Sequence, residues 1–152
     1  MRWCDGCVLQ FTEPMEAAPP SFYEEHEFYA GPEAYYVSPH VLGWDQGQFF
    51  IDRPGPGSRL LDIGCGAGQF VEAARQAGYR PLGIDVSRSH VELARRRFGL
   101  SDVQVLSLEE LARSKPRPFE VVTAFQVLEH VANPLAFLVQ AADLLEPGGY
   151  LG

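Results

Sequence analysis

The chain is poor in cysteine, in positive charge and in long apolar runs. Three cysteines in 152 residues are too few for a disulfide framework. We therefore expect the protein to reside in the reducing cytoplasm. Lys and Arg number 12 against 20 Asp and Glu, a net charge of -8 that argues against nucleic acid or an anionic membrane as the main partner. No apolar run approaches a membrane span, and no signal-peptide core follows Met1.

The most informative stretch is an apolar run that breaks into alternating glycines. Residues 59–63 lead into Gly64, Gly66 and Gly68, a pattern that predicts a buried strand turning sharply into a helix. Glycine leaves no Cβ between an amide and a ligand, and the first N–H groups of the helix aim at the same place. We therefore expect a small molecule to bind against bare backbone at this turn.

The spacing of the glycines fits a dinucleotide site poorly. The fingerprint of such sites, G-x-G-x-x-G, has its third glycine where Gln69 stands. Asp62 suits a cationic ligand better than a pyrophosphate. Residues 81–86 indicate a second buried strand containing Asp85, at the sequence distance from Gly66 where a carboxylate binds ribose hydroxyls. Two such carboxylates suit a ligand that is half nucleoside and half amino acid. Gln69 in place of the third glycine makes a nicotinamide-dependent enzyme the less favoured alternative.

Four segments, taken in order, resemble motifs of the class I S-adenosylmethionine-dependent methyltransferases: residues 61–68, 83–85, 119–131 and 145–149. The resemblance implies an α/β fold with a doubly wound, mostly parallel Rossmann-like sheet and helices on both faces, incomplete at the C-terminus. It also implies methyl transfer from S-adenosylmethionine to a small-molecule acceptor, with sugar, quinone-like and lipid-like acceptors all open. The alternative is a module that binds the donor without turnover.

The resemblance further assigns a donor-binding site. The glycine turn would hold the methionine portion, Asp85 the ribose, and an N-terminal tyrosine, Tyr35 or Tyr36, would cover the pocket. After the third strand, either Ser107 or Glu109 would face the adenine amino group. The complete expected set is Asp62, Gly64, Cys65, Gly66, Gly68, Phe70, Asp85, Val86, Ser107, Leu108, Phe125, Gln126 and Tyr36.

Few catalytic side chains are expected, because a sulfonium already carries an activated methyl group and the enzyme mainly holds a nucleophile in line with it. For a hydroxyl or acidic carbon acceptor, His130 is the residue best placed by type and position to take the proton. Alternatively, Glu129 and His130 only pin the loop and line the pocket. Cys65 lies between glycines, where it is unsuited to act as a nucleophile.

Cys4 and Cys7 form a C-x-x-C pair near the start of the chain. The spacing suits two ligands of one zinc ion, but a structural zinc needs four. The surrounding stretch resembles half of a zinc-binding module found before the domain in some relatives, and His26 or His40 are alternative partners. The other interpretation is a pair of free thiols.

The sequence divides near Pro54. Residues 1–53 are expected to form an irregular or helical cap segment, and residues 54–152 a partial donor-binding domain. We expect helices at 69–76, at 87–98 opened by Ser87 or by Ser89, and at 134–145 with Leu138 buried. Ser89 with Glu92 matches a capping box. Residues 107–110 are expected to form a loop. Because the family's domain continues beyond a fifth strand starting near 147, we expect this chain alone to be weak or inactive.

Overall fold

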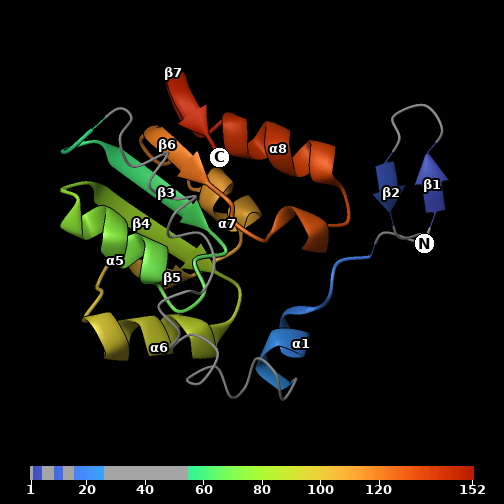
Figure 1. The fold of residues 1–152 in the computed structure, drawn as a ribbon, viewed down its shortest axis with the longest axis horizontal. Coiled ribbons are helices and arrows are strands. Elements are labelled where there is room, and N and C mark those ends of the chain that lie inside the picture. Colours follow the sequence, from blue (N-terminus) through green and yellow to red (C-terminus); the bar gives the residue numbers. More distant parts are fainter. Residues whose placement is uncertain (1, 5–8, 12–15, 26–54) are drawn as a thin grey trace.

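The computed structural model describes residues 2–4, 9–11, 16–25 and 55–152 (Figure 1). Residues 55–152 form a parallel sheet of five strands in the order β5-β4-β3-β6-β7. The strands are β3 (Arg59–Ile63), β4 (Arg80–Asp85), β5 (Val103–Val105), β6 (Phe119–Thr123) and β7 (Leu145–Leu151). The order reverses direction between β3 and β6. The expected doubly wound α/β fold is confirmed.

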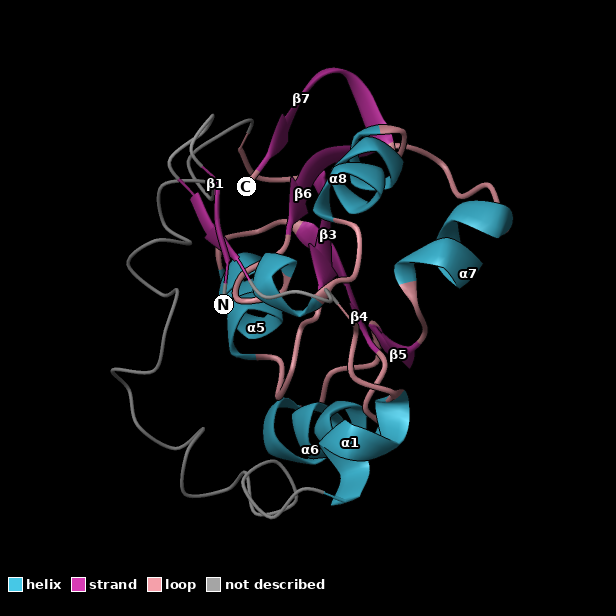
Figure 2. Ribbon diagram, turned by 90° about the vertical axis from the view of Figure 1, so that its right-hand side faces the viewer, coloured by secondary structure: helices cyan, strands magenta, loops and turns pink. Residues whose placement is uncertain are grey.

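Helices cover both faces of the sheet (Figure 2): α5 (Gln69–Gln76) and α6 (Arg88–Phe98) lie on one, α7 (Leu108–Arg113) and α8 (Pro134–Ala142) on the other. Leu60 of β3 packs with Ala74 of α5, whereas the next residue, Leu61, packs with Leu108 of α7 and Ala141 of α8. Successive strand residues point to opposite faces, so a central parallel strand must be apolar on both sides.

The start of α6 differs from the expected capping box. Ser87 is the N-cap, and its Oγ accepts a hydrogen bond from the N–H of His90 at 3.3 Å. The capping box of Ser89 and Glu92 is therefore wrong. Ser87 follows the last residues of β4 in extended backbone conformation, which is the geometry that an N-cap serine needs.

The expected loop at residues 107–110 is instead the first turn of α7. The N–H of Glu110 donates to Ser107 Oγ at 3.2 Å, and the N–H of Ser107 donates to Glu110 Oε2 at 2.9 Å. This reciprocal capping box satisfies two backbone donors that would otherwise lack a partner at the helix start. The signal for this cap in the sequence is the S-x-x-E pattern of Ser107 and Glu110.

The C-terminal elements also differ in detail. Helix α8 ends at Ala142, and Leu138, expected to be buried, is 37% exposed. The last strand begins at Leu145, which lies opposite Phe119, while Tyr150 lies opposite Val121. Between these pairs β6 advances by two residues and β7 by five, so residues 146–149 bulge out of the ladder.

Before residue 55 the structure describes three short elements. Strands β1 (Arg2–Cys4) and β2 (Leu9–Phe11) form an antiparallel pair, which the sequence analysis did not anticipate, and α1 (Pro20–Glu25) is a short helix. The division of the chain near Pro54 remains a prediction. Within the described ranges, no helix has the length and apolarity to cross a membrane.

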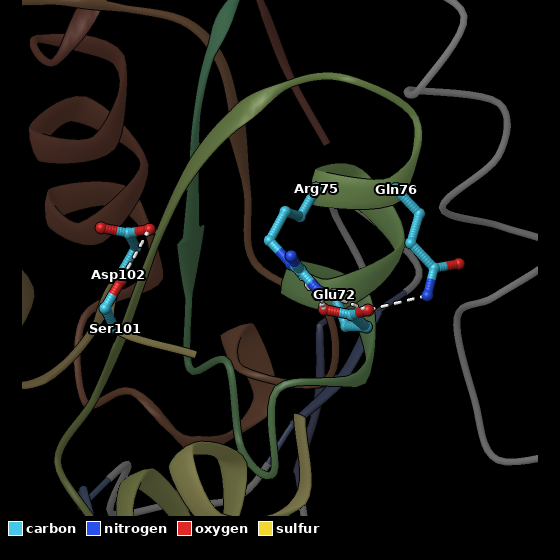
Figure 3. A network of polar contacts seen from close by, with 5 residues as sticks. All are labelled: Glu72, Arg75, Gln76, Ser101 and Asp102. Atoms are coloured by element: carbon cyan, nitrogen blue, oxygen red, sulfur yellow. Dashed lines mark hydrogen bonds and ion pairs between the residues drawn. The ribbon is translucent and has the colours of Figure 1, made fainter. Parts of the chain in front are cut away.

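The exposed side of α5 carries a small polar network (Figure 3). Glu72 accepts hydrogen bonds from Arg75 Nε at 2.8 Å and from Gln76 Nε2 at 2.7 Å. Ser101 donates to Asp102 just before β5. Solvent-exposed pairs of this kind contribute little to stability, and neither group lines the cavity described below.

Gly68 sets the distance between α5 and α6. A Cβ at this position would lie 2.8 Å from Ala94 Cβ and 2.8 Å from Leu100 Cδ1, and its φ is +79°. We predict that Gly68→Ala lowers the free energy of unfolding by about 2–4 kcal/mol, through crowding and backbone strain together. Urea denaturation measures the change.

Gly99→Ala is the matched control. Gly99 has φ +63°, but an added Cβ would meet nothing within 4 Å, so only strain of about 1–2 kcal/mol is expected. Equal losses in the two variants would contradict the packing role of Gly68.

Candidate functional site

A cavity of about 650 Å³ opens at the carboxyl ends of β3, β4, β5 and β6. Its walls include Ile63, Asp85, Leu106 and Phe125, each at or just beyond the end of one of these strands. Ligands of doubly wound proteins bind at this edge, beside the point where the strand order reverses. The volume falls in the range of small-molecule pockets, about 300–1,000 Å³.

The glycine turn forms one wall and is tied to the end of β4. The N–H groups of Gly64 and Cys65 both donate to the carbonyl of Ile84, at 2.8 and 3.0 Å. The N–H of Gly66 donates to Asp85 Oδ2 at 2.8 Å. A Cβ on Gly64 would come within 2.4 Å of Val127 Cγ2. Backbone alone therefore fits between the sheet and the loop after β6.

Asp85 joins three parts of the site. Besides the bond from Gly66, its Oδ1 accepts a hydrogen bond from the N–H of Ser87 at 2.8 Å, the residue that caps α6. Each carboxylate oxygen has a second lone pair, and Asp85 lines the cavity. The carboxylate is thus fixed by the backbone and can still accept hydrogen bonds from ligand hydroxyls.

Asp62 is a buried carboxyl in the cavity floor. It is 3% exposed, and its Oδ1 accepts a hydrogen bond from Thr123 Oγ1 at 2.8 Å. Burial raises the pKa of Asp62 to about 7, with a further increase from the charge of Asp85 and an opposing effect of the Thr123 hydrogen bond. A cation placed beside it would favour the ionised form.

Two aromatic pairs flank this polar floor. The rings of Phe70 and Phe125 meet at 81° with centroids 5.0 Å apart, and those of Tyr23 and His130 meet at 90° with centroids 6.3 Å apart. All four residues line the cavity. The site therefore combines fixed acceptors with apolar walls, which suits a ligand with both polar and flat apolar parts.

Cys65 lines the cavity but is 7% exposed. Burial raises the pKa of its thiol, and the neighbouring Asp62 and Asp85 raise it further. Since the thiolate is the reactive form, the physical setting agrees with the expectation that Cys65 is not a nucleophile.

The structure brings most of the expected site residues to this one cavity. Those that line it are Asp62, Gly64, Cys65, Gly66, Phe70, Asp85, Val86, Ser107, Leu108, Phe125, Gln126 and His130, together with Glu109. Gly68 is not in the wall and contacts α6 instead. Tyr35 and Tyr36 fall outside the described residues.

The proposed zinc site is not supported. Among the described residues, no group of three or more His, Cys, Asp or Glu side chains is placed to hold a metal ion. Cys4 belongs to β1, whereas Cys7, His26 and His40 lie outside the described residues. Zinc binding at Cys4 and Cys7 therefore remains only a prediction from the sequence.

Several wall residues were not identified from the sequence. Tyr23 comes from α1, and His90, 4% exposed, comes from the first turn of α6. Val131 and Phe137 contribute from the segment around the start of α8. The sequence signal that could have placed His90 in the wall is the cap at Ser87. An N-cap at Ser87 puts His90 in the first turn of α6, beside the end of β4. Nothing in the local sequence distinguishes Tyr23 from the neighbouring aromatic residues.

Comparison with known proteins agrees with this geometry. A family model described as a methyltransferase domain matches residues 39–151. The chain belongs to this methyltransferase family. It is 43% identical over 100 residues to a protein named ubiquinone biosynthesis O-methyltransferase from Xanthomonas campestris, an alignment covering 63% of this chain and 42% of that relative. The chain thus spans less than half the length of this relative.

Solved structures show the same methyltransferase fold. An S-adenosylmethionine-dependent methyltransferase from Thiobacillus denitrificans, in complex with S-adenosylhomocysteine, superposes with a TM-score of 0.60 at 24% identity, covering 90% of this chain and 55% of that chain. The cyclase SpnF superposes with a TM-score of 0.59 at 31% identity, covering 70% of this chain and 43% of that chain.

The raised pKa of Asp62 makes stability depend on pH. In the unfolded chain this carboxyl ionises near pH 4, but in the folded protein only near pH 7. Between these values the folded state holds the extra proton, so the contribution of Asp62 to stability falls as pH rises and levels off above 7. We predict that Asp62→Asn gains stability over the natural chain across this window, by about 2–4 kcal/mol at pH 7.5.

Urea unfolding of both proteins at pH 4.5, 6 and 7.5 measures this difference. Other titrating groups are shared by the two proteins, so they cancel in the comparison. A difference in unfolding free energy that stays constant with pH would contradict a buried, protonated Asp62.

Proposed function

We propose that the cavity binds S-adenosylmethionine and that the domain transfers its methyl group to a small-molecule acceptor. The observation that carries this proposal is the pair of carboxyls in one cavity, Asp85 held by the glycine turn and Asp62 buried beside it. A ribose requires fixed acceptors, and a cationic amino acid portion requires a carboxylate partner. Membership of the methyltransferase family and the names of the relatives support the same donor.

In the proposed complex the donor's ribose hydroxyls donate to Asp85, and its methionine portion lies on the backbone from Gly64 to Gly66, near Asp62. Val86 and Leu108 flank the adenine, and Ser107 or Glu109 faces its amino group. Phe70 and Phe125 supply the apolar wall. Gly68 acts indirectly by setting the position of α5, and Tyr36 is proposed from the family resemblance alone.

The donor supplies a methyl group on a positively charged sulfur, so transfer is an in-line displacement: the acceptor atom bonds to the methyl carbon while the carbon–sulfur bond breaks and its electrons stay on sulfur. The fixed turn and carboxylates orient the reacting groups. When the acceptor is a hydroxyl, we propose that a ring nitrogen of His130 takes its proton. His130 lines the cavity and is exposed, so it is accessible to an acceptor.

We further propose an oxygen atom of a small quinone-like or phenolic molecule as the acceptor. The relative at 43% identity is named an O-methyltransferase of ubiquinone biosynthesis, and a base such as His130 is useful for hydroxyl acceptors in particular. We also propose that residues 54–152 form the donor-binding domain and that residues 1–53 form a cap. The alternative is donor binding without methyl transfer. One structural neighbour is named a cyclase, so this fold does not by itself require methyl transfer.

Calorimetric titration tests the donor. We predict that the chain binds S-adenosylmethionine and S-adenosylhomocysteine but not NAD, and that Asp85→Ala weakens adenosyl binding at least about 30-fold, because two charge-assisted hydrogen bonds and the anchor of the glycine turn are lost. Asp102→Asn is the control: it removes one negative charge at the start of β5, outside the cavity wall. No binding of either adenosyl compound by folded protein would refute the proposal.

Transfer of a labelled methyl group to a panel containing catechol, simple sugars and amines tests the reaction. In line with the expectation that this chain alone is a weak catalyst, we predict slow transfer to catechol oxygen and a further loss in kcat of about 10²-fold or more in His130→Gln, with the affinity for S-adenosylhomocysteine unchanged. Transfer at the natural rate by the variant would exclude His130 as the base. Donor binding without transfer to any acceptor would favour the non-catalytic alternative.

A further inference from the structure

Tyr23 connects a distant part of the chain to the proposed base. It belongs to α1, yet its ring lies perpendicular to that of His130 with centroids 6.3 Å apart. Both side chains line the same cavity. Aromatic rings favour perpendicular contacts at centroid distances of about 4.5–7 Å. The contact is therefore a specific one between α1 and the loop after β6.

The backbone of His130 is fixed by a hydrogen bond, whereas its imidazole is exposed. The residue ends the short 3-10 helix η1 (Leu128–His130), and its N–H donates to the carbonyl of Val127 at 2.9 Å. Gln126, the residue before Val127, has a φ of 57°. Among the described residues, no hydrogen bond or ion pair orients the exposed imidazole. The contact with the Tyr23 ring restrains its direction.

Tyr23 is itself supported. The ring of Phe22 meets it at 90° with centroids 5.5 Å apart, and the N–H of Phe22 donates to the carbonyl of Pro19 at 2.9 Å. Tyr23 is half-buried, whereas Phe22 is 41% exposed. The helix thus presents a tyrosine of restricted orientation to the cavity wall.

Building on the proposed function, we propose that Tyr23 is a positioning residue that holds the His130 imidazole in the direction from which it accepts the acceptor's proton. The ring of Tyr23 makes this contact. A general base contributes only when its nitrogen lies within hydrogen-bond reach of that proton. Loss of the ring therefore lowers turnover through His130 while leaving the donor site intact.

A double-mutant cycle tests this coupling, with labelled S-adenosylmethionine as donor and catechol as acceptor. Tyr23→Ala is expected to lower kcat about 5- to 20-fold with the KM for the donor unchanged, and Tyr23→Phe, which keeps the ring, to restore most of it. In the His130→Gln background, Tyr23→Ala is expected to change kcat less than about twofold. The control Tyr150→Ala removes a tyrosine that is 40% exposed and outside the cavity wall.

Three results would overturn the proposal: equal losses in both backgrounds, a loss in Tyr23→Phe as large as in Tyr23→Ala, or unchanged kcat in Tyr23→Ala. NMR provides a readout that needs no acceptor. The ring-proton signals of His130, assigned by their absence in His130→Gln, should shift in Tyr23→Ala and stay nearly in place in Tyr23→Phe. Signals that do not move in Tyr23→Ala would refute the contact.

The same samples separate this proposal from the proposed function. Calorimetric titration with S-adenosylhomocysteine reports on the donor site, which Tyr23→Ala should leave unchanged. Failure of the natural chain to bind that compound would count against the donor assignment. Normal binding, together with His130 ring-proton signals that do not shift in Tyr23→Ala, would count against the role of Tyr23 alone.

Discussion

The carboxylate of Asp85 holds the candidate site together. Its two oxygens accept hydrogen bonds from the N–H groups of Gly66 and Ser87, both at 2.8 Å, so a single side chain links the turn after β3, the end of β4 and the start of α6. The carbonyl of Ile84 adds two more bonds to the same turn. These contacts are made within the protein, so the cavity floor is formed before any ligand binds, which lowers the entropy lost on binding.

The same floor contains a group that is unfavourable for folding. Asp62 is buried, and the hydrogen bond from Thr123 only partly offsets the desolvation of its charged form. A hydrophobic residue there would pack more simply in the core. Strongly perturbed carboxyls in clefts are characteristic of functional sites, and in the proposed complex the cationic portion of the ligand lies beside this one. One carboxylate of the floor is thus oriented by two backbone N–H groups, and the other is buried with a hydrogen bond from Thr123.

The sequence predicted those features that depend on local pattern. Helix α5 begins and ends where expected because glycines bound it at Gly68 and Gly78, and Asp85 lies in the cavity because the ends of adjacent parallel strands meet at one edge. Local pattern was ambiguous where Ser87 and Ser89 could each cap α6: Ser89 with Glu92 matches a capping box, but Ser87 is the cap, and His90 was left unassigned. Tyr23 was not predictable, because its place in the wall depends on how α1 packs against a loop more than a hundred residues later. Leu138 was misassigned because a helix's apolar stripe does not reveal how much of it the sheet covers.

A crystal structure of this chain with S-adenosylhomocysteine tests the central claim most directly. The account predicts that both ribose hydroxyls lie within hydrogen-bonding distance of the Asp85 carboxylate, about 2.5–3.0 Å, and that the amino acid portion rests on the backbone of Gly64 to Gly66. A nucleoside bound away from Asp85, with the glycine turn uncontacted, would contradict it.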